Sequence, residues 1–291
     1  MNTADPTAQI AELENQAERI ETDFGGSSLC WHKWSSPHAE RPPIVLLHGG
    51  FGSWTHWFRV IPALRAEAPV ICADLPGLGA SDDVALPHTP EKLADILVQG
   101  LDQLLDERQP FHLVGFSFGG LLGSLVAATF TEQCLNFIAV GASGFGSLHH
   151  IVDGIELPGA DMSDREIEAV HRKNLGLLMF AEAETIDALS LHIQRHNVSR
   201  GRVRSRRLSM SDGLLQALPD IKAKIGGIWG ELDSTGGGRE AIKKRAEIFR
   251  RHQPGAAFDI IKGAGHWVMY ERPQAFVDTL LRQLQKSEPE D

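Results

Sequence analysis

The sequence predicts an α/β fold built on a mostly parallel, doubly wound sheet, with a helical cap inserted into the chain. Short apolar runs that read as buried strands alternate with longer segments of helical periodicity. This alternation is typical of a parallel sheet covered on both faces. It stops between about residues 145 and 220, where helix-like pieces occur without a convincing strand. Such a segment is too long for a plain connection, so it is interpreted as an inserted cap.

The first part of the chain supplies the opening strands and two helices. Residues 1–24 are expected to form an N-terminal arm or short helix with one modest apolar face, made of Ile10, Leu13, Ala17 and Ile20. Strands are expected in SLCWHKW, PIVLLHGG and PVICADLPG, and a helix in SWTHWFRVIPALRAE. A second helix is expected in TPEKLADILVQGLDQLLDE, with Thr89 as its N-cap and Pro90 at its first position.

The second part continues the same pattern on both sides of the cap. Residues 111–116 read as a buried strand and residues 119–129 as a helix with small residues. Further strands are expected in CLNFIAVGA, KIGGIWGELD and AAFDIIKGAGH, and the closing helix from Pro273 to about Gln285. The charged tail is expected to fray. The predicted units are therefore an arm at 1–24, a core at 25–144 and 221–291, and a cap at 145–220.

Composition narrows the class of protein. The 291 residues are 42% apolar and 23% charged, as in soluble globular proteins. The net charge of −10 argues against nucleic acid as a partner, because phosphate binding requires a basic face. No run reaches the ~18 apolar residues of a membrane span, and the N-terminus lacks the apolar core of a signal peptide. Cys30, Cys72 and Cys134 form neither a metal spacing nor a disulfide framework, so we expect reduced core thiols in a cytoplasmic protein.

The stretch HLVGFSFGG at 112–120 places a serine at the predicted strand-to-helix corner. Gly115 and Gly119 flank Ser117, and a crowded corner of this kind requires residues without a Cβ. The same geometry exposes a hydroxyl for nucleophilic attack. A glycine-rich turn with a capping serine is the plainer alternative. The catalytic interpretation therefore depends on a base, an acid and an oxyanion site elsewhere in the chain.

Two later loops supply an acid and a base in the required order. A serine hydroxyl is a weak nucleophile, so it needs a histidine to take its proton and a carboxylate to orient that histidine. Asp233 follows the strand that ends near Trp229, and His266 follows the last strand. Glu231 is the rival acid. The alternation at the strand end points Glu231 differently, so Asp233 is preferred.

Addition to a carbonyl also requires two N–H donors for the developing oxyanion. One is expected from the backbone of Phe118, directly after the nucleophile. The other is expected from LLHGGFG, where glycines let the backbone approach the substrate; Gly50 is preferred, with Phe51 as the neighbouring alternative. The Phe51 side chain is expected either to pack in the core or to line the acyl pocket. His48 in the same motif is interpreted as a structural hydrogen-bonding residue.

Taken together, the motifs HGGFG, DLPGLGASD, GFSFGG, GELD and GAGHWVMYERP resemble the α/β-hydrolase fold family. They extend over roughly residues 43–285. The resemblance implies the fold predicted above and a triad of Ser117, Asp233 and His266. The haloalkane dehalogenases and epoxide hydrolases of this family carry an aspartate at the nucleophile position, so Ser117 points away from their chemistry.

Within the family, the HGG motif, the long cap and Trp267 directly after His266 resemble the carbon–carbon bond hydrolases of aromatic catabolism. In that group a cap arginine binds the substrate carboxylate, and the resemblance assigns this role to Arg195. It also implies a substrate-binding role for Trp267. The group usually carries Asn directly before the nucleophile, whereas this chain has Phe116. An ester substrate is therefore at least equally favoured.

The cap also reverses the overall charge of the chain. From 192 to 207 it has no acidic residue and six arginines, at positions 195, 200, 202, 204, 206 and 207. They are explained either as a solvated face with ion pairs to the acidic core, or as a set in which one member faces the cleft and selects an anionic substrate.

These observations predict a cofactor-independent serine hydrolase that cleaves an ester, or a C–C bond next to a carbonyl, in a small anionic substrate. Two alternatives stay open: a non-catalytic ligand-binding protein of the same fold, and a cofactor-free oxygenase, which needs no serine nucleophile. The expected partner is a small molecule. No metal, nucleic acid or membrane partner is expected, and a homodimer is left open.

Overall fold

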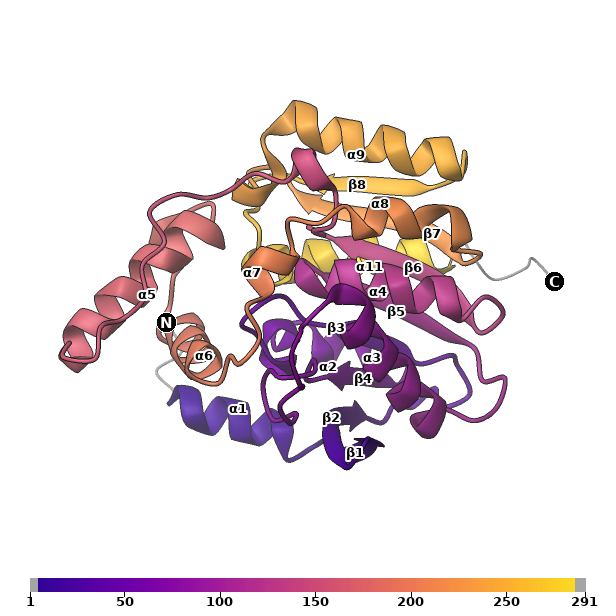
Figure 1. Cartoon of the computed structure of the whole chain (residues 1–291), viewed down its shortest axis with the longest axis horizontal. Helices are drawn as coiled ribbons and strands as arrows, with labels where there is room; N and C mark the ends of the chain where they lie inside the picture. The colour runs from indigo at the N-terminus through magenta and orange to yellow at the C-terminus, as the bar shows by residue number, and fades with distance from the viewer. Residues whose placement is uncertain (1–4, 286–291) are drawn as a thin grey trace.

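The computed structural model describes residues 5–285 and contains an eight-stranded sheet (Figure 1). The strand order is β1-β2-β4-β3-β5-β6-β7-β8. β1 and β2 pair antiparallel, as do β2 and β4, and the remaining neighbours pair parallel. The strands are β1 (Glu18–Phe24), β2 (Ser27–Trp34), β3 (Ile44–Leu47), β4 (Val70–Ala73), β5 (Phe111–Phe116), β6 (Cys134–Val140), β7 (Lys224–Gly230) and β8 (Ala257–Ile261). The predicted mostly parallel α/β fold is therefore confirmed.

Helices cover both faces of the sheet, as Figure 1 shows. Successive residues of β3 face opposite sides, so that Val45 and Leu47 belong to one apolar core and Ile44 and Leu46 to the other. Burial on both faces explains why the strands are almost continuously apolar. The first core is covered by α3 (Pro90–Leu104), α4 (Phe118–Thr129) and α9 (Arg239–His252), and the second by α2 (Ile61–Leu64) and α11 (Pro273–Gln285).

The N-terminal segment differs from the expected arm. A helix, α1 (Pro6–Glu14), is present, but the chain then forms β1, so Ile20 lies in a strand and not on a helical face. Gly25 and Gly26, with φ of 66° and 86°, form the turn of the β1–β2 hairpin. The Thr22 hydroxyl accepts a hydrogen bond from Trp31 Nε1 at 2.9 Å across this pair. Pairing with the neighbouring strand β2 thus outweighs the weak helical periodicity of this segment. The tail that was expected to fray, residues 286–291, lies outside the described residues.

Between β6 and β7 the chain is helical and contains no strand. Its α-helices are α5 (Asp164–Leu178), α6 (Ala188–Ser199), α7 (Ser205–Leu208) and α8 (Gly213–Ala217). Figure 1 shows α5 and α6 to one side of the sheet, whereas α8 lies over α4. Asp187, the N-cap of α6, connects this segment to the core: its carboxylate accepts hydrogen bonds from Tyr270 Oη at 2.7 Å and from Arg59 at 2.5 Å. We keep the name cap for residues 145–220.

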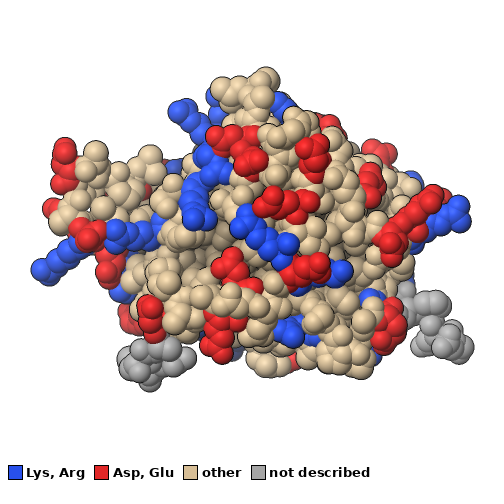
Figure 2. Space-filling view, turned by 90° about the horizontal axis from the view of Figure 1, so that it is seen from below, with Lys and Arg blue, Asp and Glu red and all other residues tan. Residues whose placement is uncertain are grey.

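One face of the molecule carries both acidic and basic side chains. Figure 2 shows acidic and basic side chains interspersed on one face, without a continuous basic area. Within residues 5–285, no helix combines the length and the apolar character needed to cross a bilayer.

Candidate active site

Ser117 lies at a sharp corner between β5 and α4. Its φ of 53° is unusual for a residue with a side chain, and it is held by the packing around it. A Cβ on Gly115 would lie 2.4 Å from the carbonyl oxygen of Gly119, and a Cβ on Gly119 would lie 2.4 Å from that of His48. The corner can therefore form only with glycine at both positions. Ser117 is half-buried and lines the mostly apolar cavity described below.

Asp233 and His266 come together from the loops that follow β7 and β8. The Nδ1 atom of His266 lies 3.0 Å from both carboxylate oxygens of Asp233. An ionised carboxylate only accepts hydrogen bonds, so Nδ1 carries the proton and Nε2 is left free to accept one. Three further hydrogen bonds converge on Asp233 Oδ1, from Thr235 N at 2.8 Å, Thr235 Oγ1 at 2.8 Å and Gly236 N at 3.2 Å.

The environment of Asp233 keeps it charged. Burial alone would raise the pKa of its carboxyl, but the adjacent His266 and the hydrogen bonds from Thr235 outweigh burial and lower it below the usual value. Glu231 is engaged elsewhere, because it pairs with Arg239 and accepts a hydrogen bond from Gly263 N at 3.1 Å. The structure thus brings Asp233, and not Glu231, to His266.

Three backbone N–H groups in the segments expected to bind the oxyanion have no acceptor among residues 5–285. Within the described residues, neither Gly50 N nor Phe118 N donates a hydrogen bond, and the same holds for Phe51 N. Phe118 is the first residue of α4, where backbone donors lack intrahelical partners. Unpaired donors at this position can bind a negative oxygen. The Phe51 ring and Gly50 both line the cavity, whereas the Phe118 side chain is buried in the core.

The residues behind the site hold its loops in place. His48 Nε2 accepts a hydrogen bond from Leu75 N at 2.9 Å and its Nδ1 donates to Gly49 O at 2.7 Å, so both ring nitrogens are occupied. Burial lowers the pKa of His48 to about 4, which keeps this ring neutral. Trp267 is fully buried and does not line the cavity; it donates to His56 O at 2.8 Å. Its backbone N donates to Met179 O at 2.8 Å, which ties the His266 loop to the cap.

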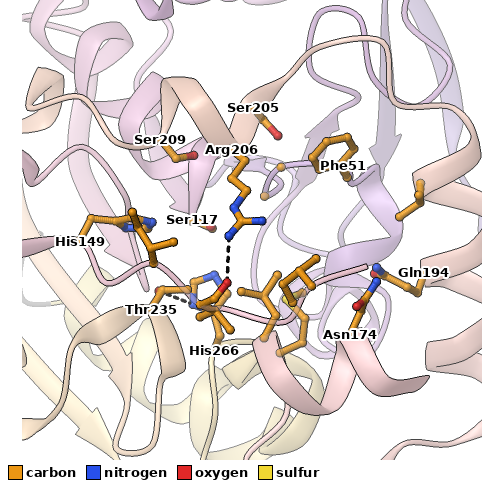
Figure 3. A pocket seen from close by; sticks show the side chains of 18 of the residues that line it. Phe51, Ser117, His149, Asn174, Gln194, Ser205, Arg206, Ser209, Thr235 and His266 are labelled. Carbon is orange, nitrogen blue, oxygen red and sulfur yellow. Dashed lines mark hydrogen bonds between the residues drawn. The ribbon is translucent and has the colours of Figure 1, made fainter. Parts of the chain in front are cut away.

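The structure does not bring Arg195 to the cavity. This side chain is 51% exposed, lies in a separate cleft between α5 and α6, and pairs with Asp164 at 2.6 Å. Arg206, on α7, lines the cavity instead (Figure 3). Its guanidinium donates to Val152 O at 2.9 Å and has no carboxylate partner among residues 5–285. Both belong to the basic run noted in the sequence, but periodicity could not distinguish them because the chain between α6 and α7 is irregular.

The cavity has a volume of about 170 Å³, and a cavity of about 150 Å³ holds one benzene ring. Ser117 and His266 both line it, and most of its lining residues belong to the cap. Polar residues that sequence reasoning missed also line it: His56, His149, His150, Glu156, Asn174, Gln194, Ser205, Ser209 and Thr235. Burial, together with the nearby His266 and Arg245, lowers the pKa of His149 to about 4. Its apolar lining includes Phe116, Ile151, Val152, Ile155, Leu157, Leu178, Met179, Val198 and Met210.

Among the described residues, one cluster has the donor types of a metal site. Cys30 Sγ lies 3.6 Å and Asp74 Oδ2 3.7 Å from His32 Nε2. Burial opposes a charge on His32, but its contacts with Asp74 and Cys30 outweigh burial and raise its pKa to about 9. The other ring nitrogen of His32 has no partner, whereas a metal-bound histidine normally donates its second N–H. We therefore interpret the cluster as a buried ion pair.

The comparisons with known proteins agree with this architecture. The model of the Alpha/beta hydrolase family matches residues 44–279. A 2-hydroxy-6-oxononadienedioate/2-hydroxy-6-oxononatrienedioate hydrolase from Comamonas testosteroni is 26% identical over 251 residues, which cover 81% of this chain and 85% of that protein. A 2-hydroxy-6-oxo-6-phenylhexa-2,4-dienoate hydrolase from Burkholderia cepacia is 28% identical over 248 residues, covering 80% and 84%.

Solved structures are similar in fold at lower identity. An esterase from Rhodococcus sp. ECU1013 superposes with a TM-score of 0.74 at 21% identity, and the match covers 94% of this chain and 100% of the esterase. A meta-cleavage product hydrolase from Pseudomonas fluorescens IP01 superposes with a TM-score of 0.71 at 18% identity, covering 92% and 98%.

Proposed function

Because this chain belongs to the alpha/beta hydrolase family, we propose that it is a serine hydrolase that works through Ser117, His266 and Asp233. The observation that carries the proposal is the Asp233–His266 contact at 3.0 Å, beside a cavity that is lined by both His266 and the strained Ser117 corner. Each residue follows a strand at the same edge of the sheet, in the order nucleophile, acid, base.

The mechanism follows from the protonation states. Ser117 Oγ attacks the substrate carbonyl carbon while His266 Nε2 takes its proton, and Asp233 stays ionised and stabilises the imidazolium. The carbonyl oxygen becomes an oxyanion, and the N–H groups of Gly50 and Phe118 bind it. His266 then gives its proton to the leaving group, which departs and leaves an acyl-serine. Water attacks the acyl-serine with His266 as base, and the acid product and Ser117 are released.

The substrate is proposed to be a small ester or a compound cleaved at a C–C bond next to a carbonyl. The names of two relatives describe hydrolases of oxo-dienoates, which supports the second class. Phe116 supports the first, because its buried ring packs 4.9 Å from the His266 ring and offers no amide next to the nucleophile. A cavity of about 170 Å³ accommodates a group of roughly one aromatic ring on the acyl side.

An anionic substrate would meet Arg206 and not Arg195. Arg206 reaches the cavity without a carboxylate partner, whereas Arg195 already pairs with Asp164 on the surface. A guanidinium binds a carboxylate through two parallel hydrogen bonds, so one residue suffices to select for it. The cytoplasmic location remains a prediction from the sequence, which leaves a homodimer open.

A substrate panel tests this proposal. Short-chain p-nitrophenyl esters and vinylogous 1,5-diketo acids are compared on the wild-type protein and on Ser117→Ala. Turnover of either class that Ser117→Ala abolishes supports a serine hydrolase, and the class with the higher kcat/KM identifies the bond. Specific binding without turnover would indicate a ligand-binding protein instead. Oxygen consumption would indicate an oxygenase.

A further inference from the structure

A second serine lies at the edge of the proposed oxyanion site. Ser205, the first residue of α7, is only 1% exposed, yet it lines the cavity. Its hydroxyl makes no hydrogen bond within residues 5–285. A buried hydroxyl without a partner costs free energy unless water or a ligand satisfies it. The Ser205 hydroxyl is therefore available to a molecule bound in the cavity.

The neighbourhood of Gly50 locates this hydroxyl. A Cβ built on Gly50 would lie 2.4 Å from Ser205 Oγ, 3.0 Å from Ser205 Cβ and 3.8 Å from Phe118 Cβ. Since a Cα–Cβ bond is about 1.5 Å long, Ser205 Oγ lies within about 4 Å of the Gly50 Cα. The hydroxyl, the Gly50 backbone and the start of α4 thus surround one corner of the cavity. Figure 3 shows Ser205 on the side of the pocket opposite His266.

We propose that Ser205 donates a third hydrogen bond to the oxyanion, beside the N–H groups of Gly50 and Phe118. This inference rests on the proposed function. Negative charge develops on the carbonyl oxygen as Ser117 adds, and the Ser205 hydroxyl turns its hydrogen toward that oxygen. No bond to Ser205 forms or breaks. Because a hydroxyl binds the charged oxygen more strongly than the neutral carbonyl, its contribution appears in the transition state.

The position of Ser205 also links the cap to catalysis. The two backbone donors belong to the core, whereas Ser205 belongs to the cap, two residues after Val203, whose side chain packs at Gly77 in the core. The complete set of donors is assembled only when the cap is seated on the core. The same contact explains why a side chain at position 50 would collide with the cap.

Ser205→Ala tests the assignment, with Ser209→Ala as the matched control. Ser209 is also on the buried side of the α7 region and lines the cavity, but it is not among the nearest neighbours of Gly50. With a p-nitrophenyl ester, Ser205→Ala is expected to lower kcat about 10²-fold, the loss typical of one oxyanion donor, with little change in KM. Ser209→Ala is expected to change kcat far less. Circular dichroism and thermal unfolding establish that both variants are folded.

An aryl boronic acid supplies the second measurement, because it forms a tetrahedral adduct with Ser117. Its affinity should fall in Ser205→Ala by the same factor as kcat/KM, while KM for the neutral ester should change little, because the neutral carbonyl oxygen gains little from the hydroxyl. A loss confined to KM, or equal losses in the two alanine variants, would overturn the assignment. If Ser117→Ala abolishes turnover while Ser205→Ala leaves kcat unchanged, only the Ser205 inference fails. If the wild-type protein hydrolyses none of the esters or diketo acids, the proposed function fails and this inference fails with it.

Discussion

Replacing Asp233 with Asn is expected to change the tautomer of His266 with little change in shape. The hydrogen bonds from Thr235 and Gly236 converge on Oδ1, so the amide oxygen of Asn would take that place. The amide NH₂ would then stand where Oδ2 now lies, 3.0 Å from His266 Nδ1. Oδ1 also lies 3.0 Å from Nδ1, but three hydrogen bonds from Thr235 and Gly236 already converge on it. The NH₂ group donates only, so we expect Nδ1 to accept from it and the ring hydrogen to move to Nε2.

The size of the effect follows from this exchange. A His266 ring with hydrogen on Nε2 cannot take the proton of Ser117, and the loss expected from a wrong tautomer is about 10⁴-fold in kcat. At 1.36 kcal/mol per tenfold change, this corresponds to about 5 kcal/mol of transition-state stabilisation. KM should change little, because Asp233 is buried behind His266 and does not line the cavity.

Steady-state hydrolysis of a p-nitrophenyl ester at neutral pH measures the loss. Glu231→Gln is the matched control, since Glu231 contacts Arg239 and Gly263 N and not His266. It should retain wild-type kcat to within a few-fold. A mild Asp233→Asn variant, or a severe Glu231→Gln variant, would show that the orienting acid has been misassigned.

The remaining predictions concern the nucleophile, the cavity cation and the buried ion pair. Ser117→Ala should lower kcat by about 10³-fold or more with the fold intact, and a variant with near-normal turnover would refute its role. Arg206→Ala should lower kcat/KM about tenfold for an anionic ester and little for a neutral ester. Arg195→Ala removes a surface ion pair worth about 0–1 kcal/mol and should change kcat/KM for neither ester. Equal losses for both esters in Arg206→Ala would indicate general damage to the cap. The contacts with Asp74 raise the pKa of His32 to about 9, above its usual 6.5, so their stabilisation is complete below about pH 6.5 and disappears as the pH rises through 9. Urea unfolding should show that the free energy of unfolding of the wild-type protein falls by up to about 3 kcal/mol between pH 6.5 and pH 9.5. The decrease should be smaller in His32→Gln, and an equal decrease in both proteins would contradict the assignment.

The regular part of the core could be predicted closely from the sequence. The strand and helix expected at 111–116 and 119–129 are observed as β5 and α4, and the closing helix begins at Pro273 as expected and continues to Gln285, the last described residue. These elements are fixed by local periodicity, glycine positions and caps such as Thr89, whose side chain accepts a hydrogen bond from Lys92 N at 3.2 Å. The β1 strand was missed because its pairing with β2 is a contact between segments, and its own pattern is only weakly apolar.

The candidate triad was also accessible from the sequence, for a topological reason. Parallel strands present their carboxyl ends at one edge of the sheet, so residues that follow β5, β7 and β8 lie near one another. Ser117, Asp233 and His266 could therefore be placed together from their order and their distance from strand ends. Asp233 could be preferred to Glu231 because side chains alternate in direction at the end of a strand, which points Glu231 away from the site.

What only the tertiary structure decided is how the cap meets the core. The six cap arginines are equivalent in sequence, but folding directs Arg206 to the cavity and leaves Arg195 on the surface with Asp164. In the same way, nothing local to Ser205 indicates that it lies against Gly50, 155 positions earlier in the chain. The sequence by itself determined the sheet, the Ser117 corner and the order of the proposed catalytic residues, because backbone geometry and strand direction follow from short-range patterns. The part of the cavity wall that the cap supplies was decided by packing between irregular segments far apart in the chain. In such segments no helical or strand periodicity relates a residue's position in the sequence to the direction of its side chain.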